Sequence, residues 1–129
     1  MVDLQFGGSK WGNGKWLGVL NNDFEAIVKM DKLTKVSEVT LNCIEETGAG
    51  IHFPTQFQVW VSSDGQNYQN MGITKNPNIA SSDYNTETTT QDFGVKFEEI
   101  DVLFIKVKAD VREIKGRGIF IFADELIVN

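Results

Sequence analysis

The chain has 129 residues, 41% of them hydrophobic and 23% charged, which is the balance of a folded globular domain rather than of a disordered chain. No apolar run approaches the roughly 20 residues of a membrane-spanning helix. The 12 basic and 18 acidic residues give a net charge of −6, which argues against non-specific nucleic-acid binding because that binding needs Lys and Arg at the phosphates. We therefore expect one domain over residues 1–129, monomeric when isolated.

A glycine-rich loop near the start carries two tryptophans, in KWGNGKWLG at 10–18. Trp16 precedes an apolar run and is expected in the core. Trp11 lies between Lys10 and Gly12 and has no local apolar partner. It is either an exposed ring that stacks on a ligand or a loop residue that covers neighbouring surface.

Short β patterns follow, and no segment keeps a 3.6-residue apolar period over the length of a helix. The predicted strands are 23–30, 35–44, 55–63, 67–73, 89–97, 101–111 and 118–128. Within one of them Phe57 and Val59 share a face, while Trp60 should point to the other side of the sheet. Asp64–Gly65 then supplies a turn that is typical of β-hairpins. Together these patterns predict an all-β fold, an antiparallel β-sandwich.

Catalytic machinery is difficult to assemble from this sequence. It has one histidine, His52, and one cysteine, Cys43, whose strand face it shares with Val39 and Leu41, so a buried structural thiol is expected. Disulfides, two-histidine zinc sites, nucleophile elbows and phosphate-cradling loops are all ruled out by the sequence. Adjacent acids such as Glu98–Glu99 point to opposite faces of a strand, whereas glycoside hydrolysis needs two carboxylates across a cleft. The chain is therefore not expected to be an enzyme.

Two acids interrupt the apolar closing segment FADELIVN at 122–129. Asp124 and Glu125 either lie at a sandwich edge in solvent or bind a cation, because an unpaired charge inside a strand is costly. Calcium takes about six to eight oxygen ligands, and Asp3 with the backbone of 7–9 would supply the remainder. The hypothesis is a structural calcium ion, held by Asp3 and Glu125, that joins the two ends of the chain.

Several segments, taken in order, resemble galactose-binding-like domains: WLGVLNNDFEAIVKM, GIHFPTQFQVWVSSDGQNY, FIKVKA and GIFIFADELIV. This group includes discoidin domains, factor V and VIII C domains and family 32 carbohydrate-binding modules. The resemblance spans nearly the whole chain and looks closest to the C-terminal modules of secreted chitobiases and β-hexosaminidases. It implies a jelly-roll sandwich that binds galactose- or N-acetylhexosamine-type glycans as a non-catalytic part of a glycoside hydrolase.

The same resemblance implies the setting and the ligand contacts. The chain would be cut from the C-terminal part of a longer secreted polypeptide, located outside the cell, in the periplasm or on the cell surface, with the parent's catalytic domain as a partner. Ligands bind on loops at one end of such sandwiches, where aromatic rings stack on sugars and amide, Arg or His side chains bind hydroxyls. The expected carbohydrate contacts are Trp11, Asn13, His52, Phe53, Arg112 and Arg117.

Ordinary structural roles remain open for these residues, His52 as a hydrogen-bonding group and both arginines as parts of a solvated turn. The chain also departs from the family pattern. Lys29–Met30–Asp31 replaces the usual Asp-Leu-Gly, Leu103–Phe104–Ile105–Lys106 replaces Arg-Tyr-x-Arg, and REIKGRG at 112–118 lacks the Trp-His pair of chitobiase modules. Two alternatives therefore stay open: a purely structural sandwich packed on a catalytic domain, and a discoidin-like protein-interaction module.

Overall fold

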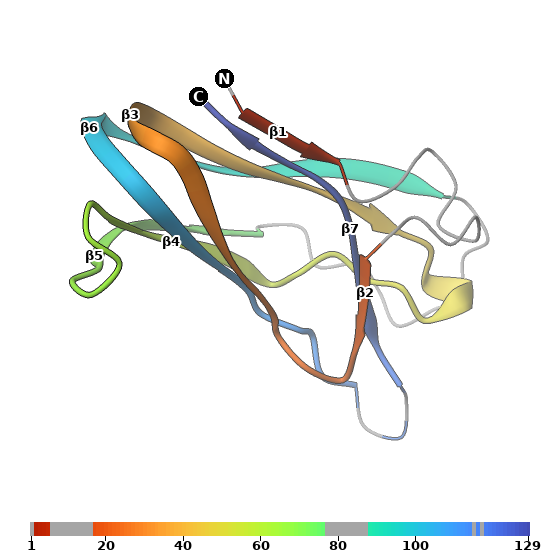
Figure 1. Cartoon of the computed structure of the whole chain (residues 1–129). Coiled ribbons are helices and arrows are strands. Elements are labelled where there is room, and N and C mark those ends of the chain that lie inside the picture. Colours follow the sequence, from red (N-terminus) through yellow and green to blue (C-terminus); the bar gives the residue numbers. More distant parts are fainter. Residues whose placement is uncertain (1, 6–16, 77–87, 115, 117) are drawn as a thin grey trace.

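A computed structural model describes residues 2–5, 17–76, 88–114, 116 and 118–129 of the chain (Figure 1). The strands are β1 (Val2–Gln5), β2 (Leu17–Leu20), β3 (Phe24–Glu45), β4 (Gln56–Ser62), β5 (Gln69–Lys75), β6 (Thr89–Ala109) and β7 (Phe120–Val128). A single 3₁₀ turn, η2 (Thr47–Ala49), is the one helical element within these ranges. The all-β class is confirmed, and no helix in the described ranges is long and apolar enough to cross a membrane.

The strands form one antiparallel sheet that doubles back on itself. Its order is β1-β7-β3-β6-β4-β5, with β2 also paired to β7. β3 and β6 pair along most of their length and fold over together, so that two layers face each other (Figure 1). The first layer contains β1, β7, the C-terminal half of β3 and the N-terminal half of β6. The second contains the other halves of β3 and β6 with β4 and β5, so the predicted sandwich is confirmed.

Extra residues in β3 and β6 produce the fold-over. The register shifts on β3 between Lys29 and Thr34, and the stretch of β6 from Lys96 to Ile100 is longer than the β3 segment that pairs with it. Bulges of this kind bend a strand without ending its pairing. The expectation of shorter, separate strands was therefore wrong for two pairs of segments: 23–30 with 35–44, and 89–97 with 101–111.

β1 and β2 were not expected from the sequence, because four residues are too few to show a clear alternation. Both strands pair with β7: Val2 lies opposite Val128, and Leu17 lies opposite Ala123. The two ends of the chain consequently lie side by side (Figure 1).

The core lies between the two layers and follows the alternation of the strands. Phe57, Val59 and Val61 of β4 are all buried, whereas Trp60 is half-buried on the outer face of the second layer, as predicted. There the Lys106 ammonium lies 5.4 Å from the centroid of the Trp60 ring. A cation at this distance from an indole ring is weakly attracted to it.

Cys43 lies in this core and is fully buried, so the expected structural thiol is confirmed. Burial raises the pKa of the Cys43 thiol far above its ordinary value, and the nearby Asp92 carboxylate raises it further. Since the thiolate is the reactive form, this cysteine is chemically quiet in the folded protein.

The Asp64–Gly65 turn joins β4 to β5, as predicted. The Asp64 carboxylate accepts hydrogen bonds from the backbone N–H groups of Gln66 (2.8 Å) and Asn67 (2.9 Å). These bonds hold the pKa of Asp64 well below its usual range. Gly65 has φ +80°, and a Cβ there would lie 2.8 Å from the ring of Phe104. Glycine is therefore required both by the backbone conformation and by the close approach.

Candidate functional site

Two loops that are distant in sequence, 45–55 and 110–119, meet at one end of the sandwich. A parallel bridge joins Ile51 to Phe120. The Phe120 N–H donates to the Gly50 carbonyl at 2.8 Å, and the His52 N–H donates to the Phe120 carbonyl at 3.0 Å. The loops that carry two of the expected contacts, His52 and Arg112, are thus brought together, while Trp11 and Asn13 of the expected 10–18 loop lie outside the described residues.

A cavity of about 320 Å³ opens between these loops, and we call it the loop-end cavity. It is lined by Thr47, Gly48, Ala49, Gly50, His52, Gly116, Gly118 and Ile119. Much of its wall is glycine backbone, so the hollow exists because no side chain fills it. Peptide N–H and C=O groups can therefore meet a ligand directly.

Gly50 allows the two loops to approach each other. It caps the C-terminal end of η2 with φ +77°, a left-handed conformation that costs glycine little. A Cβ at Gly50 would lie 3.0 Å from the carbonyl oxygen of Gly118. Any other residue at position 50 would therefore strain the backbone and push the walls of the cavity apart.

The turn between β2 and β3 holds both ends of the 110–119 loop. Near the end of the loop, Ile119 donates its N–H to the Asn21 side-chain oxygen at 2.8 Å and accepts from the Asn21 N–H at 2.8 Å. Near its start, the Val111 N–H donates to Asp23 Oδ1 at 2.9 Å. The other Asp23 oxygen lies 3.4 Å from Lys108 Nζ, and the hydrogen bond to Asp23 is the main reason that the pKa of Lys108 is raised.

Replacing Asn21 by alanine is expected to lower the free energy of unfolding by about 1–2 kcal/mol, because the Ile119 N–H loses its acceptor and alanine must adopt a positive φ. The backbone at Asn21 has φ +54°. Asn22→Ala is the matched control, since the Asn22 amide bonds only the nearby Leu20 carbonyl (3.0 Å) among the described residues. Urea unfolding of both variants measures the difference, and equal losses would contradict the role given to Asn21.

The structure places His52 and Phe53 deeper than the sequence suggested. His52 is 1% exposed although it lines the loop-end cavity. Phe53 is 9% exposed and packs edge-on against Phe93, with ring centroids 5.7 Å apart. Its ring is thus part of the core, where it contacts Phe93 of β6, and is not offered to solvent as a stacking surface.

The remaining expected contacts are only partly described. Arg112 is half-buried and follows the point where Asp23 holds the loop. Trp11, Asn13 and Arg117 lie outside the described residues, as does the side chain of Asp3. In the backbone register Asp3 lies opposite Ile127, and Glu125 lies opposite Gln5. Across the described residues, no group of three or more His, Cys, Asp or Glu is placed to hold a metal ion.

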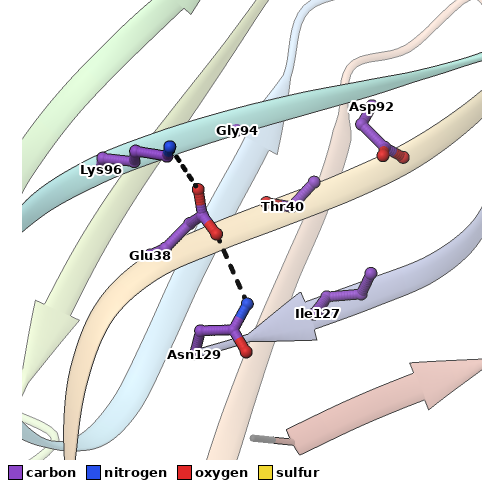
Figure 2. Close-up of a pocket in the computed structure, with 7 residues that line it drawn as sticks. All are labelled: Glu38, Thr40, Asp92, Gly94, Lys96, Ile127 and Asn129. Carbon is purple, nitrogen blue, oxygen red and sulfur yellow. Dashed lines mark hydrogen bonds and ion pairs between the residues drawn. The ribbon is translucent and has the colours of Figure 1, made fainter.

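A second hollow, which the sequence did not reveal, lies on the outer face of the first layer (Figure 2). This sheet-face groove has a volume of about 590 Å³. It is lined by Glu38, Thr40, Asp92, Gly94, Lys96, Ile127 and Asn129. The polar side chains on β3 alternate there with the buried Val39 and Leu41, and this alternation was the available signal.

Solved structures share this antiparallel sandwich architecture. The K2 cleaved adhesin domain of Lys-gingipain matches with a TM-score of 0.56 and 12% identity, over 99% of this chain and 80% of that one. The family 32 carbohydrate-binding module of Streptococcus pneumoniae EndoD matches with a TM-score of 0.51 and 8% identity, over 86% of this chain and 75% of that one. The expected likeness to family 32 modules is therefore confirmed for the fold.

The C-terminal domain of a chitobiase from Bacteroides fragilis is also similar, with a TM-score of 0.45 and 18% identity over 94% of this chain and 72% of that one. Against a larger Bacteroides thetaiotaomicron alpha-L-fucosidase chain (TM-score 0.48, 12% identity), 87% of this chain is covered but only 22% of the other. No family model and no curated protein sequence matches the chain.

Proposed function

We propose that this chain is a non-catalytic carbohydrate-binding module that binds a galactose- or N-acetylhexosamine-type glycan at the loop-end cavity. The observation that supports this most is a glycine-walled cavity between loops 47–52 and 116–119, at the end of a sandwich whose fold a family 32 module shares. Ligand sites are typically concave, with few polar groups that fix orientation. Arg112 lies on the same loop as Gly116, and in this proposal it is the charged residue that binds a sugar hydroxyl.

In this proposal the chain is one domain of a secreted glycoside hydrolase and holds that enzyme near its glycan, outside the cell, in the periplasm or on the surface. A small cavity with few polar contacts should bind one sugar with a free energy of about −4 to −8 kcal/mol, which corresponds to millimolar to micromolar affinity. Attachment to an enzyme that binds the same glycan would raise the effective affinity without new contacts.

A glycan array with calcium present tests the function, followed by calorimetry with the sugars that bind. Trp11→Ala should abolish binding and leave the melting temperature nearly unchanged, if this ring stacks on the sugar. Trp60→Ala is the control, because Trp60 lies on the outer face of the second layer. A blank array would contradict the proposal, and a large drop in melting temperature for Trp11→Ala would assign that ring to the core.

A structural calcium ion at the paired chain ends is a separate part of the proposal. The pairing of β1 with β7 supports it, since Asp3 and Glu125 occupy neighbouring strands two pairs apart on the same ladder. Chelation with EDTA should then lower the melting temperature, because an ion that binds only the folded state stabilises it. Glu125→Gln should remove the difference between calcium and EDTA. An unchanged melting temperature in EDTA would exclude a stabilising ion.

A second candidate function is a structural accessory that packs on the parent's catalytic domain. The outer face of the second layer favours it, since Ile27 is 62% and Ile73 44% exposed beside the half-buried Trp60 and Phe104 rings. Amine labelling of Lys29 and Lys106, which lie by these rings, should then fall in the whole parent protein relative to the separate chain. Equal labelling would exclude packing through this face.

A further inference from the structure

The sheet-face groove is built from three rows of residues that cross β7, β3 and β6 (Figure 2). The first row is Asn129, Glu38 and Lys96, and the middle row is Ile127, Thr40 and Gly94. The third row contributes Asp92, which lies opposite Asn42 of β3. From the first row to the third is four residues along β3, which is roughly 13 Å of strand. The groove is therefore long enough for more than one sugar ring.

The middle row is low, and this is what makes the hollow. Gly94 has no side chain and Thr40 has a short one. A Cβ at Gly94 would lie 3.0 Å from Thr40 Oγ1, so an ordinary strand residue at position 94 would fill the floor. The exposed part of Ile127 supplies apolar surface beside this floor.

Polar side chains lie on both sides of the middle row, at the two ends of the groove. At one end Glu38 lies 3.6 Å from Lys96 Nζ and accepts from the Asn129 side-chain amide at 3.4 Å. The Lys96 side chain is 83% exposed, so this ion pair is weak and exchanges readily with a ligand. At the other end Asp92 accepts from the Asn42 amide at 2.8 Å and makes no ion pair with any described residue. Its remaining lone pairs can accept from a ligand.

We propose that the sheet-face groove is a second glycan site, which takes an internal stretch of a neutral oligosaccharide. The ligand class rests on the proposed function. Sugar hydroxyls both donate and accept, and the groove offers them carboxylates at each end, an ammonium, an amide and a hydroxyl. Two carboxylates against one lysine disfavour an anionic chain, and Ile127 with the Gly94 backbone faces the apolar C–H groups of a ring.

The direction of the groove links it to the loop-end cavity. β3 runs from Glu38 past Asn42 to Glu45 and then enters η2, which forms part of the cavity wall. An oligosaccharide that leaves the groove at Asp92 therefore heads towards the loop end of the sandwich. A chain that occupies both places gains avidity over a single sugar.

NMR titration of the full chain tests this with two probe pairs: N-acetylglucosamine with chitohexaose, and galactose with β-1,4-galactohexaose. The monosaccharide should shift only amides of 47–52 and 116–119, whereas the hexasaccharide should also shift those of Thr40, Gly94 and Ile127. A hexasaccharide that shifts the cavity amides and leaves the groove amides unchanged overturns the second site and leaves the proposed function standing. No shift with any probe overturns both.

Variants give an independent measure of the groove. Glu38→Ala with Asp92→Ala should weaken hexasaccharide binding at least fivefold and leave monosaccharide binding within twofold. Gly94→Val should also weaken hexasaccharide binding, because its side chain fills the floor. The double alanine variant removes charge and Gly94→Val adds bulk, so if one design does not fold the other still tests the groove. Glu25→Ala with Asp101→Ala is the matched control, because both are exposed carboxylates away from the groove. Equal losses in the control pair and the groove pair overturn the proposal.

Discussion

Replacing Phe57 by alanine is expected to lower the free energy of unfolding by about 3–5 kcal/mol, the usual cost of removing a buried phenylalanine ring. Phe57 is 0% exposed and lies in the second layer, opposite Thr74 of β5 and Ala109 of β6. Strands paired on both sides cannot move inward to fill the space that the ring leaves. The loss therefore includes both the transfer of the ring and the cavity that remains.

Urea unfolding followed by tryptophan fluorescence measures this loss. Ile27→Ala is the control, because Ile27 is 62% exposed on the outer face of the same layer. Its effect should stay within about 0.5 kcal/mol. A loss below about 1 kcal/mol for Phe57→Ala would show that the two layers do not enclose a rigid core at this point.

The second large effect is expected at Gly50, where alanine should lower the free energy of unfolding by about 2–4 kcal/mol. A positive φ costs alanine about 1 kcal/mol or more, and crowding against a packed neighbour costs about 1–3 kcal/mol more. The Cβ would press on the Gly118 carbonyl oxygen at 3.0 Å. Because this contact joins the two walls of the loop-end cavity, glycan affinity should fall together with stability.

Gly116→Ala is a closely matched control for this change. Gly116 has φ +80°, almost the same as the +77° of Gly50, but a Cβ at Gly116 would meet no atom within 4 Å among those described. It should therefore show only the backbone cost, about 1 kcal/mol. Thermal unfolding of both variants separates the two contributions to stability. Equal losses of stability would mean that the approach of Gly50 to Gly118 adds nothing to the backbone cost.

Much of the fold was predictable from the alternation of side chains. The burial of Phe57, Val59 and Val61, the outward position of Trp60 and the buried Cys43 all follow from a period of two residues. The sequence did not predict that β3 continues without a break. The chain near Asp31 loses its alternation of polar and apolar residues, and this pattern looks like the end of a strand. The hydrogen bonds to β6 resume at Thr34, and only the partner strand makes this visible.

The candidate site was predictable only at the level of loops. The segments that contain His52 and Arg112 were expected at one end of the sandwich, and their loops do meet there. The role of Phe53 was not predictable, since a phenylalanine beside glycine and proline looks the same whether its ring faces solvent or the core. Its contact with Phe93 comes from a residue far along the chain.

The sequence by itself determined that this protein is a β-sandwich, which strand face is buried, and where the β4–β5 turn lies, because these properties depend on neighbouring residues. Only the tertiary structure decided that β3 and β6 fold over as continuous strands, that Gly50 meets Gly118, and that Gly94 lies beside Thr40 to open a groove. Each of these depends on the register between distant segments. A shift of one residue would turn the same side chains to the opposite face.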